Sequence, residues 1–241
     1  MSYIFREHIK QSLAVIAFLI TLTACTSESY DAGDGPNSYL TADLVLLHTS
    51  QDKSVRSALL DDGTTLQFSN PFAQDWLTRP DSVYRALLYY DKTIAASDAA
   101  ASNPTATSIV RARSVRPVSV LRPVEAEDME TLRTDPVGFE SLWLSKNKSY
   151  INLSLLLKSG KTEADDAMHA LGIVSHGTTT DADRRRTLHL TLYHDQGGVP
   201  AYYTVQQYVS IPTQLLEEAD TIELTLNTYN GKKVVKVAVS N

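Results

Sequence analysis

The fold is decided most clearly by residues 221–239, which read TIELTLNTYNGKKVVKVAV. Apolar and polar residues alternate on both sides of Asn230-Gly231, a dipeptide that favours a two-residue type I′ turn because both turn positions need a positive φ. That turn predicts three apolar cross-strand pairs on one face: Leu226 with Val235, Leu224 with Val237, and Ile222 with Val239. The stretch therefore predicts a β-hairpin with one buried face.

The same alternation recurs from Tyr39 onward, interrupted by turn residues. In the first half the predicted strands are Tyr39–Thr49, Val55–Leu60, Thr64–Phe68, Val83–Lys92 and Ser108–Leu121. In the second half they are Phe139–Ser145, Tyr150–Lys158, His169–His176, Thr187–His194, Tyr202–Ile211, Thr221–Thr228 and Lys232–Val239. The first group suits a small closed or partly open barrel, and the second group suits a two-sheet sandwich.

The predicted fold class is therefore all-β, with a small barrel over residues 39–123 and a β-sandwich over residues 138–241. Residues 124–137 separate the two modules. This stretch shows no clear alternation and carries the acidic residues Glu125, Glu127, Asp128, Glu130 and Asp135. We expect it to be a short helix or a linker.

The amino terminus predicts export. A charged start with Arg6 and Lys10 precedes the apolar run Leu13–Leu22 and the small residues before Cys25, which is the pattern of a secretory signal. At ~1.5 Å per residue the run covers about half of the ~30 Å membrane core, so it is too short to span. The sequence Leu-Thr-Ala-Cys resembles a bacterial lipoprotein signal.

That resemblance implies that residues 1–24 are a signal peptide, that Cys25 carries a diacylglycerol thioether with long acyl chains such as palmitate, and that residues 25–38 are a flexible tether. Cys25 is the only cysteine of the chain. Two or three long chains would hold the protein on the membrane almost permanently. Thr26, rather than aspartate, follows the cysteine, which favours the outer membrane and leaves periplasmic and surface-exposed orientations open.

The charge of the mature chain limits its partners. Removal of Arg6, Lys10 and Glu7 with the signal leaves 20 basic and 27 acidic residues, a net charge of −7. An acidic exported body argues against nucleic acid as a partner. We expect a monomer held by its lipid anchor.

Sequence motifs for catalysis or metal binding are absent. The chain has no His-Glu-x-x-His, no Gly-x-Ser-x-Gly and no cysteine pair. We therefore expect no catalytic residues, no cofactor and no metal, and a protein that is not an enzyme. A hydrolase whose active site is assembled from residues far apart in the chain stays open as an alternative.

Aromatic residues offer the best candidates for ligand binding. Tyr202 and Tyr208 share the polar face of their predicted strand, and Tyr193 and His189 would join that face if Thr187–His194 and Tyr202–Ile211 formed a hairpin. Flat aromatic side chains among polar residues can stack on sugars or anchor a protein. The basic residues Arg111, Arg113, Arg116 and Arg122 form a second candidate, with salt bridges to the acidic stretch 124–137 as the simpler use and a polyanionic ligand as the alternative.

The chain as a whole resembles the NigD-like lipoproteins of Bacteroides-type bacteria. The resemblance lies in the leader ending at Cys25 and in four segments: SYLTADLV at 38–45, YRALLYY at 84–90, NKSYINL at 147–153 and HLTLYH at 189–194. It implies an OB-like barrel followed by a β-sandwich. The resemblance implies no catalytic residue for this chain.

These observations predict a cell-envelope lipoprotein that binds another protein or a glycan without catalysing a reaction. The alternative is a structural or adhesive surface component similar to fimbrial subunits, which would polymerise by strand exchange.

Overall fold

The computed structural model describes residues 40–92, 108–161, 167–216 and 218–239. The predictions for the signal peptide, Cys25 and the tether lie outside these residues. Strands dominate the described part, which confirms the all-β fold class. Residues from Leu40 onward form one compact unit. Within the described residues, no helix has the length and apolar character needed to cross a membrane.

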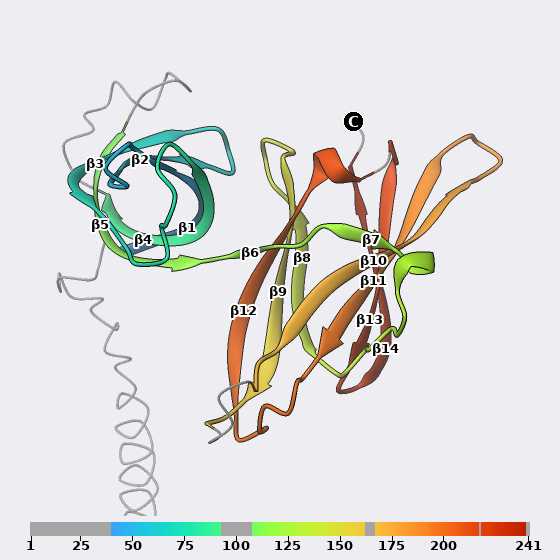
Figure 1. Cartoon of the computed structure of the whole chain (residues 1–241). Helices are drawn as coiled ribbons and strands as arrows, with labels where there is room; N and C mark the ends of the chain where they lie inside the picture. Colours follow the sequence, from blue (N-terminus) through green and yellow to red (C-terminus); the bar gives the residue numbers. More distant parts are fainter. Residues whose placement is uncertain (1–39, 93–107, 162–166, 217, 240–241) are drawn as a thin grey trace, which may run out of the picture. The chain divides into compact units, whose positions relative to one another are not determined.

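The first module is a closed barrel with strand order β1-β2-β3-β5-β4 (Figure 1). Its strands are β1 Leu40–Thr49, β2 Val55–Leu60, β3 Thr65–Phe72, β4 Val83–Lys92 and β5 Ser108–Pro117. Alternate residues point inward and fill the interior, as expected for a small barrel. The interior includes Leu47, Leu66, Leu88 and Tyr90, each at most 2% exposed.

The second module is a sandwich of two sheets, with orders β14-β13-β11-β10-β7 and β6-β12-β9-β8. Its strands are β6 Ser119–Val120, β7 Pro123–Glu125, β8 Gly138–Leu144, β9 Tyr150–Ser159, β10 Ala170–Thr180, β11 Arg186–Asp195, β12 Tyr203–Pro212, β13 Thr221–Thr228 and β14 Gly231–Ala238. Two 3₁₀ turns complete it, η2 Ala126–Asp128 and η3 Thr213–Leu215.

The sandwich core lies between the inner faces of the two sheets. The predicted apolar faces of β9 and β11 are confirmed, because Ile151, Leu153, Leu155 and Leu157 are buried together with Leu188, Leu190 and Leu192. Burying a leucine or isoleucine side chain contributes about 1.5–3 kcal/mol, so each of these residues stabilises the contact between the two sheets.

The register of the final hairpin differs from the prediction. Leu224 pairs with Val235, Ile222 with Val237 and Thr228 with Gly231, so the loop is Tyr229-Asn230. Gly231 has φ +102°, whereas Asn230 is not among the residues with positive φ. A type I turn followed by a glycine of positive φ explains this geometry. The shift amounts to two residues, so the predicted buried face is kept while the individual pairs change.

The predicted boundary between the modules is also wrong. The barrel ends with β5 at Pro117, and the two short strands after it already belong to the sandwich: β6 pairs with β12 and β7 with β10. The acidic stretch continues along the sandwich, where Val137 is fully buried. Strands of two or three residues are too short to show a period of two, so the sequence pattern could not reveal them.

Candidate ligand-binding pocket

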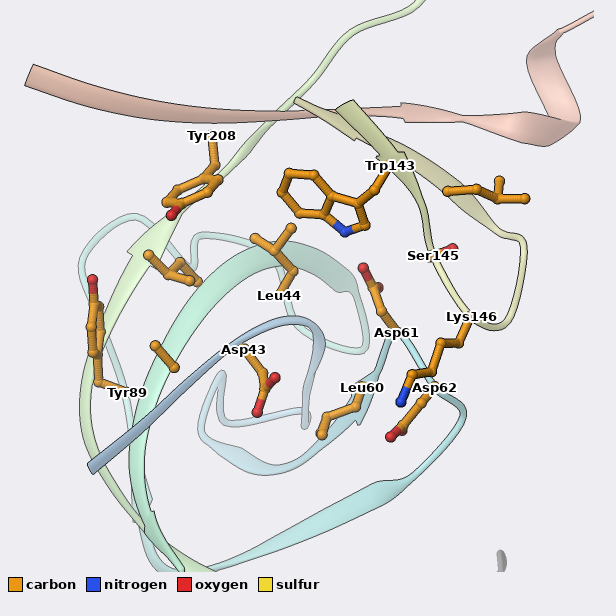
Figure 2. Close-up of a pocket in the computed structure, with 13 residues that line it drawn as sticks. Asp43, Leu44, Leu60, Asp61, Asp62, Tyr89, Trp143, Ser145, Lys146 and Tyr208 are labelled. Atoms are coloured by element: carbon orange, nitrogen blue, oxygen red, sulfur yellow. The ribbon is translucent and has the colours of Figure 1, made fainter. Parts of the chain in front are cut away.

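A pocket of about 370 Å³ lies where residues of the barrel meet residues of the sandwich (Figure 2). The barrel contributes residues from β1, from the end of β2 and from β4, and the sandwich contributes residues from β8 and β12. Its lining comprises Ala42, Asp43, Leu44, Leu60, Asp61, Asp62, Leu87, Tyr89, Trp143, Leu144, Ser145, Lys146 and Tyr208. We call it the junction pocket.

One side of the junction pocket is aromatic. Trp143 on β8 and Tyr208 on β12 meet edge to face, with ring centroids 6.4 Å apart and planes inclined by 83°. Both rings are partly buried and pack, with Tyr89, against the buried side chains of Leu44 and Leu87. This small cluster joins the two modules, because its residues come from both.

The other side carries carboxylates (Figure 2). Asp43 accepts a hydrogen bond at Oδ2 from the Tyr90 hydroxyl, 2.8 Å away, and its Oδ1 has no partner among the described residues. Burial, and then the Asp43 carboxylate, raise the pKa of Tyr90 above its ordinary value, so Tyr90 stays protonated and keeps donating. Asp43 therefore presents to the pocket a carboxylate whose orientation Tyr90 fixes.

Asp62 adds a second charge at the rim. Burial alone would raise the pKa of Asp62, but hydrogen bonds from Thr64 and the charge of Lys146 outweigh it, and the pKa lies below its ordinary value. Figure 2 shows the Lys146 side chain beside Asp62. This part of the pocket therefore pairs an acidic group with a basic one.

Asp61 lines the junction pocket, but its carboxylate oxygens are already bound by other side chains of the protein. Its two carboxylate oxygens accept hydrogen bonds from the Arg85 guanidinium at 2.6 and 2.7 Å. The amide of Asn152 donates to the same carboxylate, 2.9 Å away, and Arg85 also donates to Asn152 and Ser210 on the sandwich strands β9 and β12. The Arg85 guanidinium lies 4.3 Å from the ring centre of Tyr150. This network fixes the floor of the pocket.

Of the four predicted ligand-binding residues, the structure brings only Tyr208 into the pocket. The hairpin that would have united them does not form, because β11 pairs with β10 and β13 while β12 pairs with β9 and β6. Tyr202 is 77% exposed and precedes β12. His189 and Tyr193 lie on the other sheet, where His189 bonds to Thr179 and Glu223 at 2.8 and 3.1 Å.

The predicted salt bridges of the basic run are wrong for the described residues. Arg113 pairs with Asp91 on the neighbouring strand β4, and no ion pair in the described ranges links Arg111, Arg116 or Arg122 to residues 124–137. The same ranges contain no group of three His, Cys, Asp or Glu side chains that could hold a metal ion.

Sequence reasoning missed Trp143, Asp43 and Arg85. Trp143 and Tyr208 are far apart in the chain and are united only by the pairing of β8 and β12 with β9. One signal was available for Arg85, a charged residue in the middle of the apolar run YRALLYY of β4. A cation at such a position must find partners when it is buried.

The fold and the pocket define an all-β protein of two modules, an OB-like barrel followed by a β-sandwich. The chain belongs to the NigD-like family: the family model for the NigD-like C-terminal beta sandwich domain matches residues 120–239. Comparison with curated proteins gives no match.

Solved structures share this fold over most of the chain. A NigD-like immunity protein from Bacteroides caccae has a TM-score of 0.60 and 23% identity, covering 82% of this chain and 92% of that chain. A "putative lipoprotein" from Bacteroides fragilis has a TM-score of 0.58 and 14% identity, covering 84% and 98%. A protein from Parabacteroides distasonis described as toxin related has a TM-score of 0.54 and 19% identity, covering 82% and 92%. At these identities the similarity establishes the fold.

Proposed function

We propose that this protein is a non-enzymatic, ligand-binding lipoprotein of the cell envelope and that its ligand occupies the junction pocket. The lipoprotein assignment is supported by the leader that ends at Cys25 and by the fold shared with a lipoprotein-like structure from Bacteroides fragilis. Attachment to the outer membrane through Cys25 would present both modules to the periplasm or the exterior.

The junction pocket is the observation that carries the proposal. It is a concave site with mostly apolar and aromatic walls and a few polar groups of fixed orientation, which is the usual character of a ligand site. Asp43 is such a group, since Tyr90 holds one of its oxygens and leaves the other available. Both modules build the walls, so the ligand would be recognised by the folded two-module protein.

The polar groups of the pocket suit binding better than catalysis. General acid–base catalysis works best with a group whose pKa lies near the working pH. The pKa of Asp62 is lowered, and that of Tyr90, which bonds to Asp43 from the barrel interior, is raised, so each is moved away from neutrality. Asp61 has both oxygens occupied by Arg85. These residues supply fixed charges and hydrogen bonds instead of proton transfer.

The edge strand β14 favours binding over a polymerising, adhesive role. β14 lies at the end of its sheet and exposes Lys232, Lys233 and Lys236. Lysines on an edge strand hinder pairing with the strand of another molecule. A protein or peptide ligand also agrees with the description of the Bacteroides caccae structure as an immunity protein.

The proposal can be tested by filling the pocket. The mature protein is purified from membranes in detergent and titrated with libraries of peptides and oligosaccharides, with Trp143 fluorescence as the readout in a Trp76→Phe background, since the chain has two tryptophans. In the Ala42→Phe variant the phenylalanine side chain should fill the pocket, so that adding the ligand no longer changes the Trp143 fluorescence. Ala170→Phe, at an exposed alanine of β10 outside the pocket, serves as the control. Binding that survives Ala42→Phe unchanged would overturn the assignment of the site.

A further inference from the structure

A second cavity of about 270 Å³ adjoins the junction pocket. The two cavities share Leu87, Tyr89 and Tyr208, so a ligand longer than either cavity would cross these three side chains. The second cavity is further lined by Arg116, Pro117 and Val118, where the chain leaves the barrel, and by Val205, Gln206 and Gln207 of β12. Tyr89 and Tyr208 stand at one border of the junction pocket in Figure 2.

Arg116 supplies the second cavity with a guanidinium group that has no partner among the described residues. Its side chain is exposed, and within the described ranges it forms no ion pair and no hydrogen bond. Arg56, Arg85 and Arg113 of the barrel each have an aspartate partner. Arg79 and Arg111, like Arg116, form no ion pair in the described ranges, but they lie outside both cavities. A guanidinium on a cavity wall presents a planar set of donors that matches a carboxylate.

The junction pocket has the opposite polarity. The pKa of Asp62 is lowered and Lys146 lies beside it, while the Asp61 carboxylate is paired with Arg85, so the Asp43 carboxylate is the acidic group without a cationic partner. The charge left for a ligand at this end is therefore negative. Between the two ends lie the apolar and aromatic side chains of the cluster around Trp143 and Tyr208.

We propose that the two cavities bind a single extended peptide segment, which places a basic side chain against Asp43, apolar side chains along Tyr208, and a carboxylate against Arg116. This assignment rests on the proposed ligand-binding function and names its ligand class. The two cavities present an acidic end, an apolar and aromatic middle and a basic end. A short peptide can match all three, because it can carry a basic, an apolar and an acidic side chain in that order. A neutral glycan would leave Arg116 and Asp43 without charged partners.

The test uses end-blocked peptides of the pattern Lys-(Leu-Ser)n-Leu-Glu, with n from 0 to 2, and variants in which Gln replaces either Lys or Glu. Binding to the detergent-purified mature protein is followed by Trp143 fluorescence in the Trp76→Phe background. Loss of one charge-assisted contact weakens binding by about tenfold. Arg116→Gln should therefore weaken the Glu-containing peptides about tenfold and leave the peptides with Gln in place of Glu unchanged.

Asp43→Asn provides the reciprocal variant, since asparagine keeps an acceptor for Tyr90 but removes the charge. It should weaken the Lys-containing peptides and spare those with Gln in place of Lys. Arg122→Gln, a nearby exposed arginine outside both cavities, should change nothing. Equal loss for all peptides in Arg116→Gln, or no peptide binding, overturns the inference. Binding of a tetrasaccharide of N-acetylglucosamine that Ala42→Phe blocks, without peptide binding, overturns the peptide ligand and leaves the proposed function standing.

Discussion

Arg85 and Asp61 form a two-pronged, nearly buried ion pair at the junction of the two modules. The arginine side chain is 1% exposed and the aspartate side chain 20% exposed, and their atoms approach to 2.6 Å. Arg85 lies in the middle of β4 and Asp61 directly follows β2, yet both also bond to Asn152 of the sandwich. The pair thus links barrel residues to sandwich residues, and its Asp61 member lines the junction pocket.

Arg85→Met should destabilise the protein strongly. Removing one partner of a buried pair leaves the other charge uncompensated, which costs about 3–5 kcal/mol. Asn152 and Ser210 would lose donors in the same step. Urea unfolding of the mature protein, compared with wild type, measures the change in the free energy of unfolding.

Arg113→Gln is the matched control for this prediction. Arg113 also pairs with an aspartate, Asp91, but its side chain is 42% exposed. Exposed pairs contribute less than about 1 kcal/mol. Equal effects of Arg85→Met and Arg113→Gln would contradict a structural role for the Arg85 network.

The sequence pattern predicted strands well and predicted contacts poorly. Val55–Leu60 and Thr221–Thr228 are found with the expected bounds because one buried face imposes a period of two. Pairing between distant strands leaves no comparable local signal. The hairpin of β11 and β12 that would have placed His189 and Tyr193 beside Tyr208 does not form, because the two strands belong to different sheets.

The site was predictable only in part for the same reason. Tyr208 was found because an aromatic residue on a polar strand face is a visible pattern. Arg85 and Ser210 are 125 positions apart in the chain, and nothing local predicts that they meet. In the sequence Asp61 has the pattern of an ordinary turn aspartate. Its ion pair with the buried Arg85 arises only from the fold.

Gly231→Ala should destabilise the final hairpin. Gly231 has φ +102°, where a Cβ is strained, and an added Cβ would meet no atom within 4 Å. The cost is therefore conformational and amounts to about 1–2 kcal/mol. Gly172→Ala on β10 is the control, because that glycine has no positive φ and its Cβ would make ordinary contact with Tyr193. If both alanines cost the same in urea unfolding, the proposed turn geometry is wrong.

Cys25→Ala should abolish lipid attachment. Cells grown with an alkyne-tagged palmitate should label the wild-type protein, because Cys25 is the only cysteine and the proposed acceptor. The Cys25→Ala protein should carry no label. Thr26→Ala, which keeps the cysteine, should label as wild type does. Label on Cys25→Ala would show that another residue carries the lipid.

The paired histidines His169 and His194 should make stability depend on pH. Nδ1 of His169 lies 3.0 Å from Nε2 of His194, and the rings stack with centroids 5.2 Å apart. Burial, and then the charge of His194, hold the pKa of His169 below its ordinary value. The unfolded chain, with a histidine pKa of about 6.5, therefore takes up the proton first as the pH falls.

The contribution of His169 to stability is complete above about pH 6.5 and is lost as the pH falls toward the lowered pKa of the folded state. The urea midpoint of wild type should therefore be lower at about pH 5.5 than at about pH 7.5. His169→Gln removes the titrating group and should reduce this difference. His176→Gln leaves the His169–His194 pair in place and should keep the wild-type difference. A pH dependence in His169→Gln as large as that of wild type would assign the effect to other groups.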